Sequence, residues 1–224
     1  GITNDLKLIF LISAAAFIIG LLFTIKLPNP VQEKELKPGT TRNVIAKNKF
    51  LFLSLLLRHI GAAAVWVILP IMIMEKWGGD LYHISVVYVA NTLTAFILMN
   101  VMASKIHLSN ITKFKIGIGA TTFVFVGLAF VTDWWMAMPF MSLVGATWAF
   151  LFIGGNFHLM ENNPRSTSTG IFSSTLSIAT VIGPIVGGTI AFLFDYVAVL
   201  YFAVAIIVCA FVVSLKIENK KILS

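Results

Sequence analysis

Residues 170–188 have the sequence GIFSSTLSIATVIGPIVGG, and this stretch decides the fold. It is apolar and rich in small residues, with Gly183-Pro184 followed one turn later by Gly187-Gly188. In a soluble helix this cluster would act as a breaker, because proline removes a backbone donor and glycine costs chain entropy. In a bilayer it is tolerated, because neighbouring helices satisfy the freed carbonyls and glycine lets two backbones approach closely. The stretch therefore indicates a transmembrane helix, provided that the rest of the chain also belongs in a membrane.

The composition indicates a membrane protein. Of the 224 residues, 58% are hydrophobic and 11% are charged, far from the balance of a soluble domain. Seven apolar stretches have about the length that crosses a bilayer: residues 6–25, 50–74, 84–104, 114–132, 135–160, 168–193 and 196–215. The first has neither the basic leader nor the small-residue cleavage site of a signal peptide, so we count it as a span. The sequence predicts an all-α polytopic membrane protein with about seven transmembrane helices.

The charges predict an orientation. The net charge of +7 would suit a nucleic-acid-binding protein, but all but three of the 16 basic residues lie between spans on one side or in the C-terminal tail. The exceptions are Lys7 and Lys76 on the other side and Arg58 inside a span. Basic residues concentrate in cytoplasmic segments. We therefore expect a multi-pass protein of the cell membrane, with its N-terminus outside, its C-terminus in the cytoplasm and no nucleic-acid partner.

The segments between spans are uneven in length. Residues 26–49 contain three prolines and six basic residues, as expected of a solvated cytoplasmic linker between two membrane units. This linker leaves one span, residues 1–25, before it, and a six-helix bundle, residues 50–216, after it, with a cytoplasmic tail at 217–224. We interpret residues 1–25 as the last helix of a preceding N-terminal half. A processed or designed seven-span chain is the alternative.

The stretch at 170–188 resembles helix eleven of the major facilitator superfamily of secondary transporters. The resemblance rests on Pro164-Arg165 in the preceding loop, Gly170 at the helix start, and the Gly-Pro-x-x-Gly-Gly pattern at 183–188. The same pattern in the equivalent fifth helix is typical of exporters of this family. The resemblance implies that residues 1–25 are helix six and that 50–216 form the C-terminal six-helix half-bundle. It also implies that Gly170, Gly183, Pro184, Gly187 and Gly188 act in helix packing or as a hinge.

One expected motif is absent. The loop between helices eight and nine of the family often carries G-x-x-x-D-R/K-x-G-R-R/K. Here the equivalent residues 99–115 are MNVMASKIHLSNITKFK, with Ser104-Lys105 in place of Asp-Arg and without either glycine.

Arg58 is the sharpest candidate for a functional residue. It lies nine residues beyond Lys49, roughly 13 Å into the membrane at the rise of a helix. No acidic residue lies inside a span, since Glu75 and Glu161 are at helix ends. A guanidinium without a counter-charge there is costly. The charge of Arg58 could be compensated by a carboxylate of the preceding half, by an anionic group of the substrate or by a water-filled cavity. The structural alternative is that backbone carbonyls at a helix break accept its hydrogen bonds.

Other polar and aromatic residues could line a substrate cavity. His59 could carry a proton in a coupled cycle, and Trp66 follows it two turns later. Further candidates are Asn91, Thr94, Trp148 and Asn156, which could contact a small solute or could link and pack neighbouring helices.

Metal and enzyme chemistry is not indicated. Cys209 is alone, and the four histidines lack ligand spacing, so we expect no metal site and no cofactor. Catalytic motifs such as G-x-S-x-G and H-E-x-x-H are missing from the sequence, so we do not expect an enzyme. The favoured function is secondary active transport of a small solute by alternating access, as an efflux-type permease that is coupled to protons or to another ion. Its partners would be the lipid bilayer, the N-terminal half and the solute.

Two alternatives remain from other classes. A seven-span receptor has the predicted topology, but 196–215 lacks the lysine of a retinal protein, and the D-R-Y and N-P-x-x-Y patterns are absent. A non-transporting membrane subunit that assembles with another protein is the second.

Overall fold

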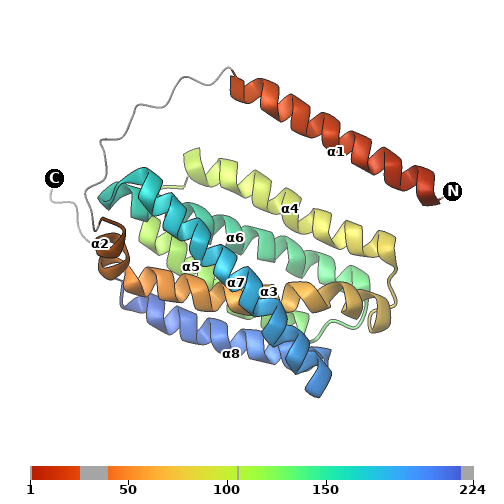
Figure 1. The fold of residues 1–224 in the computed structure, drawn as a ribbon. Helices are drawn as coiled ribbons and strands as arrows, with labels where there is room; N and C mark the ends of the chain where they lie inside the picture. The colour runs from red at the N-terminus through yellow and green to blue at the C-terminus, as the bar shows by residue number, and fades with distance from the viewer. Residues whose placement is uncertain (1, 26–39, 105, 218–224) are drawn as a thin grey trace. The chain divides into compact units, whose positions relative to one another are not determined.

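The computed structural model describes residues 2–25, 40–104 and 106–217, and every regular element in these ranges is an α-helix (Figure 1). The helices are α1 (Ile2–Ile25), α2 (Thr40–Lys47), α3 (Lys49–Glu75), α4 (Leu81–Ser104), α5 (Asn110–Leu128), α6 (Trp134–Asn162), α7 (Arg165–Leu193) and α8 (Tyr196–Leu215). Six of these described helices, α3 to α8, are long and apolar enough to cross a membrane. The predicted all-α polytopic membrane fold is confirmed.

The remaining predicted span, residues 6–25, falls on α1. The apolar part of α1 whose side chains the structure describes, Phe10–Ile25, is shorter than the six long helices. The chain divides into two compact units, Gly1–Lys37 and Pro38–Ser224, so α1 belongs to the first unit and α2 to α8 form the second. The division falls inside the predicted linker, residues 26–49.

The second part of that linker differs from the prediction. Residues 26–39 lie outside the described residues, but Thr40–Lys47 form the short helix α2. Val44 of α2 is buried, and α2 packs against α3 and α7. The Asn48 side chain donates a hydrogen bond to the carbonyl of Val44, which closes the turn into α3. The three apolar residues Val44, Ile45 and Ala46, of which only Val44 is buried, were too short a signal to predict this docked helix.

Within the second unit, α3 is the central helix and packs between α7 and α8. Helix α6 packs between α4 and α5, and α5 also packs on α8. Helix–helix contacts in a membrane depend on close backbone approach at small residues. Gly61 of α3 provides this toward α8, where an added Cβ would lie 2.7 Å from the Ile206 side chain. Gly117 of α5 does the same toward α6, where an added Cβ would lie 2.5 Å from the backbone nitrogen of Leu151.

The predicted helix boundaries hold within a few residues, with one larger error. Helix α8 has the predicted bounds, 196–215, but the span predicted at 114–132 is helix α5, Asn110–Leu128. The Ser109 hydroxyl accepts a hydrogen bond from the Thr112 N–H and caps the helix four residues earlier than predicted. A polar first turn and its cap lower the local hydropathy, so a search for apolar residues places the start too late.

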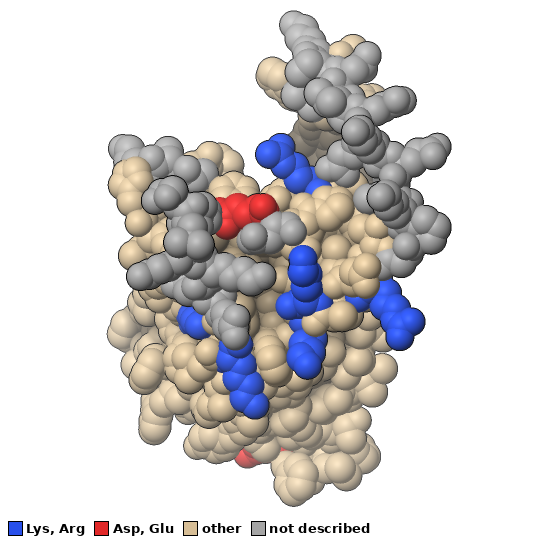
Figure 2. Space-filling view, turned by 90° about the vertical axis from the view of Figure 1, so that its left-hand side faces the viewer, with Lys and Arg blue, Asp and Glu red and all other residues tan. Residues whose placement is uncertain are grey.

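The two ends of the bundle carry opposite charge. Lys49 of α3 and Lys216 after α8 both lie over the Phe50 ring, 5.1 Å and 5.7 Å from its centre. Lys115 of α5 donates to the carbonyl of Ile217 at the same end. Figure 2, a view onto the end at which α2 lies, shows several basic side chains and little acidic surface.

The opposite end is where α3, α5 and α7 finish. Tyr196 at the start of α8 donates a 2.9 Å hydrogen bond to Glu75 at the end of α3. The Trp134 N–H at the start of α6 donates to the carbonyl of Trp77. Asp80, Asp133 and Asp195 lie in the connections at this end. The charge asymmetry seen in the sequence therefore separates along the axis of the bundle.

Candidate functional site

Helix α7 has three faces, and they define the site. Its buried face points into the bundle and consists of Ser168, Phe172, Ala179, Gly183 and Gly187. A second, exposed face is apolar and includes Ile178, Val181, Ile185 and Phe192. Between them runs a third face of exposed small or hydroxyl residues, with Ser166, Gly170, Ser173, Ser177 and Thr180 spaced three or four apart and Gly188 two turns further on. The exposed Ser174 and Thr189 lie instead on the apolar side. An exposed polar stripe beside an apolar one distinguishes two environments around a single membrane-spanning helix.

The buried face of α7 touches the middle of α3. A Cβ added at Gly183 would lie 2.5 Å from the Ala63 Cβ, and one added at Gly187 would lie 2.7 Å from the carbonyl of Ala64. Gly170 and Gly188 instead face open space, with nothing within 4 Å of an added Cβ. Of the four glycines expected to pack, two therefore do so among the described residues. Pro184 lies inside the continuous helix and is half-buried.

Arg58, the tenth of the 27 residues of α3, is enclosed in the bundle. Its side chain is 2% exposed. Nη2 donates a 3.3 Å hydrogen bond to the Thr121 hydroxyl of α5, and Nε has no hydrogen-bond partner among the described residues. Thr121 in turn donates to the carbonyl of Gly117, so it offers Arg58 a lone pair but no negative charge. The acidic side chains of α3 to α8, Glu75 and Glu161, lie at helix ends.

His59 and Trp148 link this buried cation to the polar face of α7. The Arg58 guanidinium carbon lies 5.5 Å from the centre of the Trp148 ring, within the range of a cation–π contact. The His59 ring centre lies 5.5 Å from the same ring. His59 Nε2 lies 3.3 Å from the hydroxyl of Thr180, an exposed residue of the polar face. The half-buried Trp148 thus contacts both the guanidinium of Arg58 and the imidazole of His59. The imidazole in turn reaches the polar face of α7 at Thr180.

The hydrogen bonds assign the tautomer of His59. The Thr180 hydroxyl donates its single proton to the carbonyl of Leu176, so it accepts from His59. The His59 proton is therefore on Nε2. Nδ1 is left as a bare acceptor, buried and without a partner among the described residues. This nitrogen is the one group of the site that could take up a further proton.

Aromatic rings continue the wall of the site along α6. The ring centre of Phe152 lies 5.4 Å from that of Trp148, one turn away on α6. Phe172 of α7 lies 5.7 Å beyond, edge-on to Phe152 and fully buried. The rings form a row from His59 to Phe172, so the surroundings of the single cation are otherwise apolar.

The remaining predicted cavity residues lie outside this cluster. Trp66 stacks on Tyr88 of α4, with ring centres 4.8 Å apart, and its carbonyl accepts from the Tyr88 hydroxyl. Asn91 of α4 donates to the carbonyl of Met141 on α6, which is the helix-linking use of such a residue. Asn156 is buried and donates to the carbonyl of Phe152 on its own helix. Thr94 is half-buried on α4.

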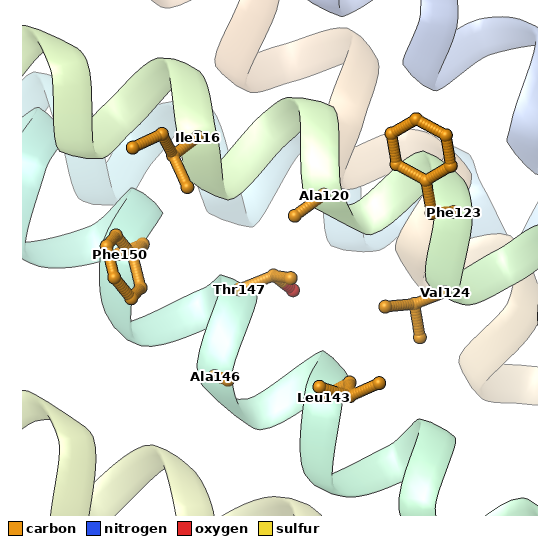
Figure 3. A pocket seen from close by; sticks show the side chains of 8 residues that line it. All are labelled: Ile116, Ala120, Phe123, Val124, Leu143, Ala146, Thr147 and Phe150. Atoms are coloured by element: carbon orange, nitrogen blue, oxygen red, sulfur yellow. The ribbon is translucent and has the colours of Figure 1, made fainter.

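A groove between α5 and α6 is a different kind of feature (Figure 3). It has a volume of about 280 Å³ and is lined by Ile116, Ala120, Phe123, Val124, Leu143, Ala146, Thr147 and Phe150. Its one hydroxyl, on Thr147, donates to the carbonyl of Val144. A groove without a free donor or a charge cannot orient a polar solute. In a bilayer it is suited to lipid chains.

No group of three or more His, Cys, Asp or Glu residues that could hold a metal ion occurs in the part of the chain that the structure describes. Titratable groups gather instead at the acidic end. The Asp80 carboxylate accepts from the His83 N–H at 3.0 Å, and this backbone hydrogen bond holds the pKa of Asp80 below its usual value. The His83 ring packs on Trp134, with ring centres 4.0 Å apart. This cluster caps α4 and is not part of the mid-membrane site.

Sequence reasoning identified Arg58, His59 and Trp148 but missed Thr121, Thr180 and the two phenylalanines. Thr121 is 63 residues from Arg58, and serine and threonine are too common in membrane helices to stand out. A signal was present in α7, where hydroxyl residues recur at helical spacing in an apolar span.

The chain was compared with known proteins at two levels. No model of a protein family matches it, and no curated protein sequence matches it.

Proposed function

We propose that the chain belongs to a secondary transporter of the major facilitator superfamily, in which the second unit is a C-terminal half that moves a small solute by alternating access. The observation that carries the proposal is the polar face of α7. This exposed face carries small and hydroxyl side chains and no large apolar one, whereas a helix surface that meets only lipid is expected to be apolar throughout. A face toward a water-filled cavity accounts for that composition.

The site at Arg58 supports the same proposal. Ionisable residues at mid-membrane usually serve substrate or ion pathways, because their desolvation is otherwise uncompensated. Arg58 and His59 contact Trp148, and His59 reaches Thr180 on the polar face. The cluster therefore connects the proposed cavity to a buried charge. His59 Nδ1 is the proposed proton site if transport is coupled to protons.

In the proposed orientation the basic end of the bundle faces the cytoplasm, and the N-terminus of the chain lies outside the cell. Single cysteines introduced at Asp133 and Lys216, in a Cys209→Ser background, test it. A membrane-impermeant thiol reagent applied outside intact cells should label Asp133→Cys and should not label Lys216→Cys. The reverse pattern would show that the orientation is inverted.

Export is the proposed direction, because the Gly-Pro-x-x-Gly-Gly pattern at 183–188 resembles that of exporters. The missing part of the cavity is proposed to come from an N-terminal half of the same gene product. The test is transport by the full-length gene product in proteoliposomes, with an imposed proton gradient and a panel of charged and neutral solutes. Solute movement that exceeds that of empty liposomes supports the proposal, and a panel without any such movement contradicts it.

A further inference from the structure

The guanidinium of Arg58 is buried without a counter-charge among the described residues. It is 2% exposed, its Nε has no partner among the described residues, and its Nη2 donates to a neutral hydroxyl at 3.3 Å. Burying a charge is unfavourable unless a counter-charge and hydrogen bonds replace the lost water. Neither α3 nor any of the helices packed on it carries a carboxylate away from its ends.

The neighbouring groups determine the charge of a ligand that would complement Arg58. His59 Nδ1 is buried without a hydrogen-bond partner among the described residues, and a second unpaired cation beside Arg58 would be unfavourable there, so we take Arg58 as the single positive charge of the cluster. A single cation matches a monoanion, because a dianion would remain half uncompensated in a medium of low dielectric constant.

The shape of the free donors indicates which monoanion fits. A guanidinium presents Nε and Nη2 along one edge, and two parallel N–H groups on that edge match the two oxygens of a carboxylate. Nε is open here, and Nη2 is occupied only by the long bond to Thr121. A spherical ion would use this edge less well, since it offers one acceptor centre and the two parallel N–H groups cannot both point straight at it.

The walls indicate the rest of the ligand. The row of rings formed by Trp148, Phe152 and Phe172 begins at the guanidinium and leads away from it along α6. An apolar or aromatic body that packs on rings gains from burial and from offset stacking. Trp148 is the half-buried side chain that contacts both Arg58 and His59, so its ring would contact a ligand bound at the guanidinium.

We infer that Arg58 and Trp148 form the binding site for a small organic carboxylate with an apolar or aromatic body, and that organic monoanions are the class of solute transported. The claim that organic monoanions are transported rests on the proposed function. The claim that they bind at Arg58 does not, because binding does not require transport.

The experiment uses the purified full chain in neutral detergent, with benzoate and phenylacetate as probes. Benzamide and benzylammonium are the neutral and cationic analogues, and chloride is the inorganic anion. The readouts are the thermal unfolding midpoint and the quenching of tryptophan fluorescence, with Trp148→Phe to assign the quenching. One lost charge-assisted hydrogen-bonded pair predicts that benzamide binds at least about tenfold more weakly than benzoate.

Two substitutions locate the effect. Arg58→Gln should abolish the preference for benzoate over benzamide, and Arg58→Lys should keep part of it, because the charge remains without the guanidinium edge. Lys49→Gln is the matched control, since it removes a basic side chain at the end of the same helix and should leave the preference intact. If Arg58→Gln does not fold, the charge preference of the unaltered chain and of Arg58→Lys decides the matter.

The inference is overturned by any of three results. These are equal or undetectable binding of benzoate and benzamide, an equal effect of chloride and benzoate, or a preference for benzoate that survives in Arg58→Gln. Proteoliposome assays with labelled benzoate separate this inference from the proposed function. Charge-selective binding without transport would leave the site standing and remove its role in transport. Transport of neutral or cationic solutes without any anion preference would remove the site and leave the transporter.

Discussion

Gly183 of α7 lies so close to Ala63 of α3 that a methyl group added at Gly183 would stand 2.5 Å from the Ala63 Cβ. One turn later, Gly187 has the same relationship to Ala64, whose carbonyl oxygen would lie 2.7 Å from an added Cβ. Both contacts involve backbone or a Cβ fixed to it, so no rotamer change can relieve them. These two glycines therefore set the distance between α3 and α7, with Pro184 between them.

Gly183→Ala and Gly187→Ala should each destabilise the protein by about 1–3 kcal/mol, because they overpack a contact between two helix backbones. The measurement is the thermal unfolding midpoint of the purified chain in detergent. Valine at either position should be worse than alanine and should also lower the amount of protein in the membrane.

Gly188→Ala is the matched control for this prediction. Gly188 follows Gly187 directly, yet nothing lies within 4 Å of a Cβ built on it. Its replacement should be neutral or should stabilise by up to about 1 kcal/mol, as expected for glycine to alanine in a helix. Equal melting of Gly187→Ala and Gly188→Ala would show that the close contact does not govern stability.

Arg58→Met should raise the unfolding midpoint while it abolishes solute binding. A buried charge without a counter-charge lowers stability, and an apolar side chain of similar length removes that cost, which is about 2.5–3.5 kcal/mol for arginine at the centre of a membrane helix. Functional sites commonly trade stability in this way. A lower midpoint for Arg58→Met would mean that the native protein compensates this charge in the absence of solute.

Thr121→Val should destabilise the protein, because it removes the hydroxyl that accepts from Arg58. A hydrogen bond to a charged group contributes about 1.5–3 kcal/mol. In the Arg58→Met background the same change should cost much less, since only the bond to the Gly117 carbonyl is then lost. The coupling measured by this double-mutant cycle reports the Arg58–Thr121 interaction. Additive effects would contradict it.

The sequence predicted the six long helices better than their ends and the short helix α2. The apolar length of each span and the breaks between spans predicted the six long helices, because a membrane helix must be both apolar and long. The start of α5 was misplaced by four residues because the Ser109 cap depends on side-chain geometry and not on hydropathy. Helix α2 was missed because its docking depends on one buried residue, Val44.

Tertiary contacts explain what could not be predicted at the site. The sequence predicted that Arg58 lies inside a span without an acidic partner, and in the structure it is buried within α3, whose one carboxylate, Glu75, is at the helix end. It could not show that Thr121 is its neighbour, because that depends on which helices pack together. Gly187 and Gly188 are identical in sequence terms, yet one packs on α3 and the other is open. Only the rotation of α7 about its axis separates them.

The Asp80 cap predicts a pH dependence at the acidic end. The His83 N–H donates to the Asp80 carboxylate, which lowers the pKa of Asp80 in the folded protein. This contribution to stability is therefore fully present above the unfolded pKa of Asp80, about 3.9, and is lost as the pH falls through the lower folded value. Asp80→Ala should melt at a lower temperature than the unaltered chain at pH 6. The difference should shrink as the pH falls below about 4.

Asp80→Asn is the control for this pH dependence. Asparagine also caps helices but does not titrate in this range. Its midpoint should not show the component that Asp80 contributes on acidification. A difference between Asp80→Ala and the unaltered chain that is the same at every pH would show that the cap does not depend on the charge of Asp80.

The two exposed faces of α7 can be compared with adjacent residues. Ser177 lies on the polar face and Ile178 on the apolar face, and both are exposed in the bundle. In a Cys209→Ser background, Ser177→Cys should react with a charged, water-soluble thiol reagent in membranes, because the reactive thiolate forms only where water reaches it. Ile178→Cys should react about ten times more slowly or not at all, since a thiol facing lipid stays protonated.

Arg58 ligands that occupy the proposed cavity should slow the reaction at Ser177→Cys and leave that at Ile178→Cys unchanged. Equal reactivity at the two positions would mean that both faces of α7 meet the same medium, and the polar face would then no longer support a transport cavity.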